Sequence, residues 1–108
     1  MVRRRVISSQ VIAWEGLAIL LCFEADWLAL GSAFRQPAVA HMEMQVLWPR
    51  GAPLPLSDTG YWSEFMSPTD VTEPGGPERL ALHLLDEFAA TQTWRVRWAR
   101  WEACGEAH

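Results

Sequence analysis

The triplet Asp58-Thr59-Gly60 has the residue types of an aspartic-protease active site, in which two such aspartates share one proton across a dimer axis. In those enzymes the triplet ends a hydrophobic strand and precedes a small residue. Here Ser57 precedes the triplet and Tyr61 follows it, and no later apolar-glycine loop supports such a site. Asp and Ser side chains also bond nearby backbone groups in turns, so the triplet predicts a turn.

Two pairs of side chains have the chemistry of metal ligands. His41 and Glu43 lie two residues apart, and His83 lies three and four residues before Asp86 and Glu87. A zinc site needs a third and a fourth ligand, and the sequence assigns none to either pair. We therefore expect no metal and no other cofactor.

The cysteines and serines show no catalytic pattern. Cys22 and Cys104 lie far apart without CxxC spacing, so free thiols are expected and a disulfide between them is the alternative. Ser57, Ser63 and Cys22 have no recognisable base partner and no nucleophile-elbow glycines. We expect no enzymatic activity.

The charge of the chain is unevenly distributed. Its 108 residues are half hydrophobic and a fifth charged, which is typical of one globular domain spanning residues 1–108. The net charge is −4, but residues 51–90 carry Arg79 alone against seven acids. This acidic centre argues against a phosphate-binding surface and favours a partner with a basic surface. A merely solvated acidic surface is the alternative.

The N-terminal residues are similar to the charged region of a signal peptide. Two polar interruptions, Ser8-Ser9-Gln10 and Glu15-Gly16, break the apolar run that follows. The longest clean apolar stretch, Leu17–Phe23, is too short to span a bilayer. We expect a cytoplasmic protein without membrane contact.

The first half of the chain is typical of strands. Residues 6–14 and 17–24 flank Glu15-Gly16, where glycine supplies the positive φ of a hairpin turn. Both faces of residues 17–24 are largely apolar, which predicts a central strand covered on two sides. Residues 25–36 then form a connection. From residue 38 to Trp48, apolar and polar residues alternate, which predicts a half-buried third strand.

The second half of the chain is expected to form a long ordered loop and then helices. Residues 49–77 hold most of the prolines, and Pro53 and Pro55 lack the N–H groups that a central strand needs. Pro77 suits the first position of a helix over residues 78–90. Its apolar stripe consists of Ala81, Leu84, Leu85 and Phe88.

The last segment fits a helix better than a strand. Trp94, Trp98 and Trp101 have helical spacing, Thr93 can cap the segment, and Gly105 can end it. Residues 94–98 also alternate with a period of two, so a strand over residues 94–101 is the alternative. With a helical part at residues 78–104, the predicted fold is α+β: a three-stranded antiparallel sheet with two C-terminal helices packed on one face.

The central loop combines aromatic and acidic side chains and is the expected interaction surface. Aromatic residues dominate binding hot spots, and acids complement a basic partner. The predicted protein-binding residues are Asp58, Tyr61, Trp62, Glu64, Phe65, Asp70 and Glu73.

A second candidate surface lies in the last segment. The chain has seven tryptophans, and Trp98 is interleaved there with Arg95, Arg97 and Arg100. Tryptophan stacks on single-stranded bases and arginine neutralises phosphates, so single-stranded nucleic acid is the alternative partner. It is less favoured because the chain is acidic and lacks a basic groove. Exposed aromatic residues also make a homodimer an alternative.

Several short segments carry a family resemblance: Ala40-His41-Met-Glu43, Ala52-Pro-Leu-Pro55, Thr59-Gly-Tyr61, Ser63-Glu-Phe65 and Gly75-Gly76-Pro77. Together they resemble small uncharacterised proteins of bacterial plasmids and prophages, of the anti-defence type. The resemblance brings no catalytic residues. It implies a non-enzymatic protein of a mobile element, similar in kind to anti-CRISPR and antirestriction proteins. The implied role is the inhibition of a nucleic-acid-targeting defence complex such as CRISPR-Cas.

Overall fold

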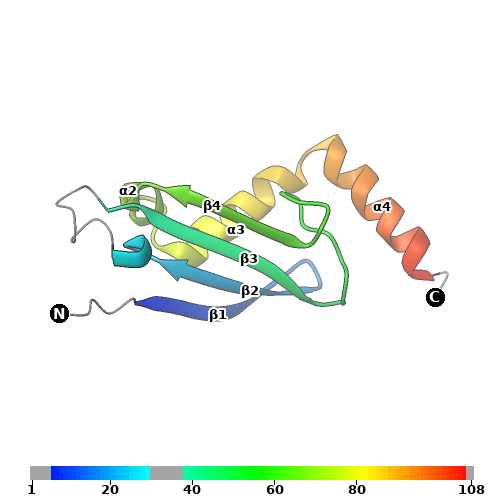
Figure 1. Ribbon diagram of the computed structural model, residues 1–108. Coiled ribbons are helices and arrows are strands. Elements are labelled where there is room, and N and C mark those ends of the chain that lie inside the picture. The colour runs from blue at the N-terminus through cyan, green and yellow to red at the C-terminus, as the bar shows by residue number, and fades with distance from the viewer. Residues whose placement is uncertain (1–5, 30–37, 107–108) are drawn as a thin grey trace.

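The computed structural model describes residues 6–29 and 38–106, which form an antiparallel sheet followed by helices (Figure 1). The sheet has four strands in the order β1-β2-β3-β4: β1 (Ile7–Trp14), β2 (Leu17–Glu24), β3 (Ala40–Trp48) and β4 (Tyr61–Met66). The helices are α2 (Pro68–Thr72), α3 (Pro77–Ala89) and α4 (Gln92–Glu106), and a short 3-10 turn, η1, spans Trp27–Ala29. The predicted α+β class is confirmed. The expected connection at residues 25–36 contains η1, and its part from residue 30 lies outside the described residues.

The first two strands form the predicted hairpin. Glu15 and Gly16 both have positive φ, 45° and 80°, which is the backbone twist that a tight two-residue turn requires. β1 and β2 pair antiparallel from Trp14–Leu17 to Ile7–Glu24. β3 then pairs with β2 and covers the predicted alternating segment.

The prediction of three strands is wrong because residues 61–66 form a fourth strand, β4. This strand lies inside the segment expected to be a loop, and it pairs antiparallel with β3 from Gln45–Tyr61 to Ala40–Met66. Aromatic residues favour strands, but β4 has aromatic side chains on both faces and shows no clean alternation of polar and apolar residues. A five-residue helix, α2, also interrupts the expected loop.

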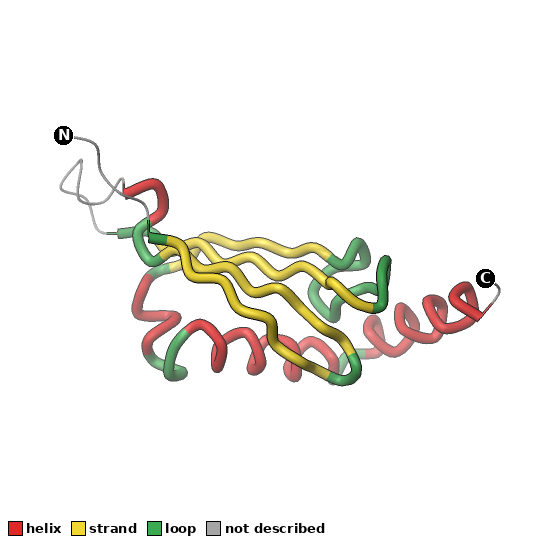
Figure 2. The backbone as a smooth tube through the Cα atoms, turned by 90° about the horizontal axis from the view of Figure 1, so that it is seen from below, coloured by secondary structure: helices red, strands yellow, loops and turns green. Residues whose placement is uncertain are grey.

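The hydrophobic core lies between one face of the sheet and α3. Figure 2 shows α3 running along this face. Alternate residues of the strands point toward α3, and the buried part of the 49–60 segment fills the space near the end of β3. The buried core residues are Ile12, Trp14, Leu17, Ile19, Leu21, Met42, Met44, Ala52, Leu54, Ala81 and Leu85.

The second strand was predicted to be covered on both faces, but the described residues leave the opposite face of the sheet, here called the open face, largely uncovered. Ala18, Leu20 and Cys22 of β2 point to it and are only half-buried. Among the described residues, η1 packs at one end of this face through Trp27. The apolar second face of β2 therefore reflects a half-exposed surface rather than a two-sided core.

The last helix, α4, does not pack on the sheet as predicted but runs past its end (Figure 1). The Thr91 side chain accepts a hydrogen bond of 3.2 Å from Trp94 N, so the helix starts at Gln92 rather than after a Thr93 cap. Gly105 lies within the helix, and the strand alternative for residues 94–101 is wrong. α4 has 15 residues, and no helix of the described ranges combines the length and apolarity needed to cross a membrane.

Candidate functional site

An apolar groove runs between β4 and α3, and we call it the β4–α3 groove. It has a volume of about 460 Å³ and is open to solvent on one side. Four of the predicted protein-binding residues line it: Trp62, Glu64, Phe65 and Asp70. The remaining lining residues are Leu56, Met66, Leu80, Leu84 and Phe88.

The groove exists because α3 covers only part of the sheet. Its buried residues Ala81 and Leu85 belong to the core, and the helix packs against β1 and β2. The adjacent helical line, Leu80, Leu84 and Phe88, is spaced by four residues and borders the groove. Phe88 remains 42% exposed. An apolar strip of α3 thus lies beside β4 without being covered by it.

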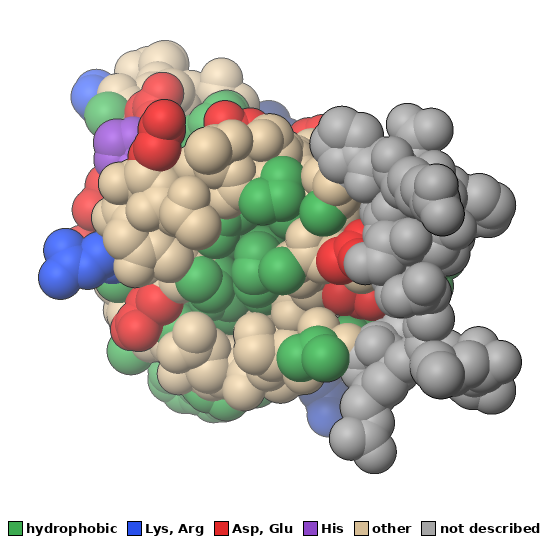
Figure 3. Space-filling view, turned by 90° about the vertical axis from the view of Figure 1, so that its left-hand side faces the viewer, with side chains coloured by type: hydrophobic (Ala, Val, Ile, Leu, Met, Phe, Trp, Pro, Cys, Tyr) green, Lys and Arg blue, Asp and Glu red, His purple; other side chains and the backbone are tan. Residues whose placement is uncertain are grey.

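Both charged residues that line the groove are acids. Glu64 is an exposed residue of β4, and Asp70 lies in the first turn of α2. Asp70 is held by a capping box: Ser67 N donates to Asp70 Oδ2 at 3.3 Å, and Thr69 N donates to Ser67 Oγ at 3.3 Å. At the end of the molecule where α2 lies, apolar side chains gather in a hollow with acidic side chains around them (Figure 3).

Trp62 has a structural role as well as a position in the groove. Its side chain is half-buried and packs against the core. Strand alternation directs Trp62, Glu64 and Met66 to the groove side and directs Tyr61, Ser63 and Phe65 to the open face. The predicted aromatic residues are therefore divided between two faces of the sheet.

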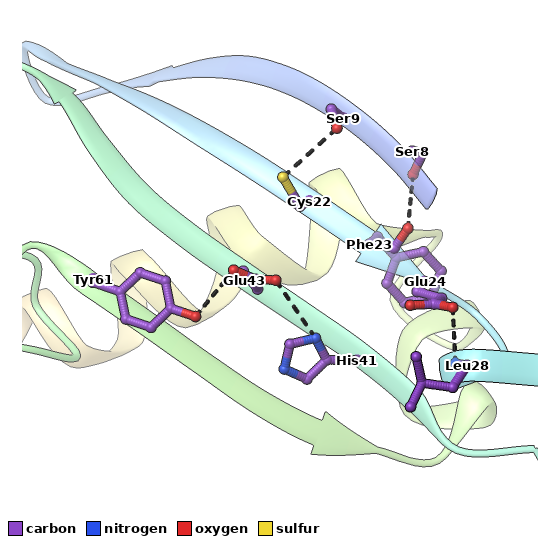
Figure 4. A network of polar contacts seen from close by, with 9 residues as sticks. All are labelled: Ser8, Ser9, Cys22, Phe23, Glu24, Leu28, His41, Glu43 and Tyr61. Atoms are coloured by element: carbon purple, nitrogen blue, oxygen red, sulfur yellow. Dashed lines mark hydrogen bonds and ion pairs between the residues drawn. The ribbon is translucent and has the colours of Figure 1, made fainter. Parts of the chain in front are cut away.

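The open face carries a polar network centred on Glu43 (Figure 4). The Tyr61 hydroxyl donates to Glu43 Oε2 at 3.0 Å, and His41 Nδ1 lies 3.8 Å from Glu43 Oε1. The pair that the sequence places on one strand face does share that face. The Glu43 side chain is 40% exposed, and its carboxylate is oriented by Tyr61 of the neighbouring strand.

An aromatic cluster closes one end of the open face. Phe65 packs edge-on against Trp27 with ring centroids 4.9 Å apart, and it lies 4.6 Å from the ring of His41. The turn η1 that carries Trp27 is held by Glu24, a residue 3% exposed whose Oε2 accepts a 2.8 Å hydrogen bond from Leu28 N. Phe65 therefore joins the open face to the rim of the β4–α3 groove.

The other predicted protein-binding residues lie elsewhere. Asp58 is exposed beside a second groove, between α4 and the proline-rich segment, that is also lined by Arg97, Arg100 and Trp101. Glu73 ends α2, where its N–H donates to Thr69 O. The structure brings four of the seven residues to one groove and leaves Asp58, Tyr61 and Glu73 outside it.

The residues of the nucleic-acid alternative are partly used inside the fold. Arg97 Nη1 donates to the carbonyls of Leu54 and Pro55, at 2.8 and 3.0 Å. Trp98 is half-buried, with its ring centroid 5.4 Å from that of Trp94. Arg95 and Arg100 are exposed.

The role of α3 as one wall of the groove was not predicted from the sequence. Leu84 and Phe88 are predicted as core residues, and Leu80 has no predicted role. The signal that could have found this wall is the second apolar line, Leu80-Leu84-Phe88, next to the buried line of Ala81 and Leu85. Two adjacent apolar lines on one helix indicate more apolar surface than a single core contact needs.

Comparisons with known proteins give one family. Neither the curated proteins nor the solved structures yielded a significant match to this chain. The family model described as the KlcB third domain matches residues 7–94, which run from β1 to the start of α4. KlcB-related proteins are associated with plasmids, which agrees with the plasmid setting implied by the resemblance. The chain belongs to the KlcB third domain family.

Proposed function

We propose that this domain is a non-enzymatic protein-binding module whose β4–α3 groove takes up a basic, partly apolar surface of another protein. The observation that carries the proposal is the composition of the groove: an apolar lining flanked by Glu64 and Asp70, with no cation among the described residues that line it. An exposed apolar groove rimmed by charge of one sign is typical of an interaction site.

The groove offers both affinity and selectivity. Apolar side chains of a partner would be removed from water against Leu84 and Phe88, and aromatic side chains are common anchors of binding energy. The carboxylates of Glu64 and Asp70 would attract Lys or Arg and repel acidic competitors. Acids of the surrounding segment strengthen this field, since residues 51–90 carry Arg79 alone against seven acids.

The finer part of the proposal is that the partner is a nucleic-acid-targeting defence complex, such as a restriction enzyme or a CRISPR-Cas complex, in the cytoplasm. Such complexes hold their nucleic acid with Lys and Arg surfaces. An acidic groove can occupy a surface of that kind in place of phosphates. Membership of a plasmid-associated family supports this setting.

The test is capture of a partner by the tagged protein from nuclease-treated bacterial lysate. The wild type is compared with Glu64→Arg, which reverses the charge in the groove, and with Glu102→Arg, which makes the same change on the exposed surface of α4. We expect one protein to be retained by the wild type and Glu102→Arg and lost with Glu64→Arg. With the purified partner, Glu64→Arg should weaken binding at least about tenfold.

Two results would contradict the proposal. Equal capture by all three proteins would show that the groove is not the binding site. A partner that is captured from untreated lysate and not from nuclease-treated lysate would instead support the alternative, a single-stranded nucleic-acid binder using Arg95, Arg100 and the neighbouring tryptophans.

A further inference from the structure

We propose that the free edge of β4 accepts a fifth strand: an extended, basic segment of the partner pairs with the β4 backbone and places alternate side chains in the β4–α3 groove. This inference rests on the proposed function and specifies how the partner is held. Strand addition at a sheet edge combines main-chain hydrogen bonds with side-chain pockets.

β4 is an edge strand whose outward-facing groups can be assigned from its register. It is the last strand in the order β1-β2-β3-β4 and forms the upper edge of the sheet in Figure 1. Val46 N donates to Gly60 O at 2.8 Å, so these residues form a hydrogen-bonded pair. In an antiparallel ladder such pairs alternate, so Trp62 and Glu64 bond to β3 through their backbone. The backbone groups of Tyr61, Ser63 and Phe65 therefore point to the free edge.

The side chain of Thr59 supports this assignment independently. Tyr61 N donates to Thr59 Oγ1 at 3.3 Å, and Thr59 Oγ1 donates to Tyr61 O at 3.2 Å. A threonine hydroxyl thus already occupies the first outward pair of groups, as an added strand would. No described residue hydrogen-bonds to the outward groups of Ser63 or Phe65. These two residues offer a short ladder that is ready to be extended.

The groove determines which side chains the added strand can carry. Side chains on its groove side would lie beside Trp62 and Glu64 and face Leu84 and Phe88 of α3. Apolar side chains fit the lining of the groove, and Lys or Arg fits the carboxylates of Glu64 and Asp70. The segment that matches both is one in which basic and apolar residues alternate or intermix.

Charge argues against a second copy of β4 as the occupant. The antiparallel register of two β4 strands that pairs only the open residues aligns Ser63 with Phe65, and it would place the two Glu64 side chains directly opposite each other. Like charges in that position are destabilising, and β4 contains no cation to offset them. Other registers require the outward groups of Tyr61, which already bond to Thr59. A basic segment of another protein removes the conflict, and it also explains why the acids lie beside this edge.

The experiment is residue-resolved amide hydrogen exchange on the full chain, with and without a synthetic peptide of about eight residues in which arginine and valine alternate. We expect saturation with this peptide to slow exchange at Ser63 and Phe65 at least about tenfold. The amides of Trp62 and Glu64 already bond to β3 and serve as internal controls. They should be slow in both states.

Matched peptides and variants separate strand pairing from charge attraction. A peptide methylated on every backbone nitrogen keeps its charge but has no backbone N–H to donate to β4 from either edge, and it should bind at least about tenfold more weakly. Ser63→Pro removes an outward N–H and leaves the β3 ladder intact, whereas Ser63→Ala keeps that N–H. We expect peptide binding to be lost with Ser63→Pro and retained with Ser63→Ala, both folded by circular dichroism.

The outcomes distinguish this inference from the proposed function. If the arginine–valine peptide binds without slowing exchange at Ser63 and Phe65, strand addition is overturned and groove binding stands. If that peptide does not bind, strand addition is overturned, and the capture experiment decides the proposed function separately. Protection of the Ser63 and Phe65 amides that rises with protein concentration, in the absence of peptide, would show that a second copy of this chain pairs with the β4 edge. That result would overturn the proposal of a basic partner segment.

Discussion

The indole Nε1 of Trp14 donates a hydrogen bond of 2.8 Å to Oδ1 of Asp86, which ties the last residue of β1 to α3. Trp14 is only 7% exposed, so water cannot easily replace this acceptor. The bond spans 72 positions of the sequence and lies next to the contact between Trp14 and Trp94. It therefore links the hairpin, α3 and the start of α4 at one point.

Removal of this acceptor should destabilise the fold. Asp86→Ala leaves a buried indole N–H without its partner, and we expect the free energy of unfolding to fall by about 1–3 kcal/mol in urea titrations. Glu87→Ala, on the exposed side of the same helix, should change it by less than about 0.5 kcal/mol. An equal effect of the two substitutions would show that the Trp14–Asp86 bond contributes nothing specific.

Arg97 should act as a structural residue of α4. Its guanidinium donates hydrogen bonds to the carbonyls of Leu54 and Pro55, so Arg97→Ala leaves both acceptors without this donor. We expect the free energy of unfolding to fall by about 1–3 kcal/mol. Arg95 is an exposed residue of the same helix, and Arg95→Ala should lower the free energy of unfolding by less than about 0.5 kcal/mol. Thermal unfolding followed by circular dichroism measures both. If Arg97→Ala unfolds like the wild type but abolishes binding of single-stranded DNA at low salt, the structural role of Arg97 is contradicted. Arg97 would then be a nucleic-acid-binding residue, as the alternative function requires.

Gly60 should be far less tolerant of a side chain than Gly16. Both have positive φ, 77° and 80°. A Cβ at Gly60 would lie 2.5 Å from the Ala52 carbonyl oxygen, whereas a Cβ at Gly16 would meet nothing within 4 Å. Gly16→Ala should cost about 1–2 kcal/mol from backbone strain alone. Gly60→Ala should lower the free energy of unfolding by clearly more than Gly16→Ala does. Comparable urea midpoints for the two variants would contradict a close approach between residue 60 and the Ala52 carbonyl.

Trp62 should contribute to stability, which limits its use as a binding probe. Because its ring packs against the core, we expect Trp62→Ala to lower the free energy of unfolding by about 2–4 kcal/mol, near the range of core truncations. Tyr61→Phe removes one exposed hydrogen bond to Glu43 and should cost less than about 1 kcal/mol. Chemical denaturation of the two variants tests this difference. A Trp62→Ala protein as stable as the wild type would assign the ring to binding alone.

The elements with a strong local period could be predicted, and those defined by distant contacts could not. The alternation before Trp48 predicts β3, the Glu15-Gly16 pair predicts the hairpin, and the spacing of Ala81 and Leu85 predicts α3. β4 was missed because its strand character depends on pairing with β3 across the intervening chain. The Ser67–Asp70 capping box of α2 was a local signal that could have been recognised.

The candidate site shows the same division. The types of Trp62, Glu64 and Asp70 indicate an acidic and aromatic surface, and the structure brings them to one groove. The second apolar line of α3, with Leu80 and Leu84, signals extra apolar surface, but its position opposite β4 depends on how α3 packs across the sheet, which is a long-range contact. Arg97 was predicted as a residue of the alternative nucleic-acid surface, and its structural role was missed because its carbonyl partners lie more than 40 residues away in the chain.

Three neighbouring tryptophans, Trp14, Trp94 and Trp98, provide an intrinsic spectroscopic probe of the fold. The ring centroids of Trp14 and Trp94 are 5.9 Å apart, and those of Trp94 and Trp98 are 5.4 Å apart, with interplanar tilts of 55° and 36°. Indoles this close and this inclined couple their electronic transitions and produce an exciton couplet. Trp14 belongs to β1 and Trp94 to α4, so the coupling of this pair exists only while α4 is docked, whereas the Trp94–Trp98 coupling lies within α4. Loss of the Trp14–Trp94 contribution to the couplet would therefore signal departure of the helix without any attached label.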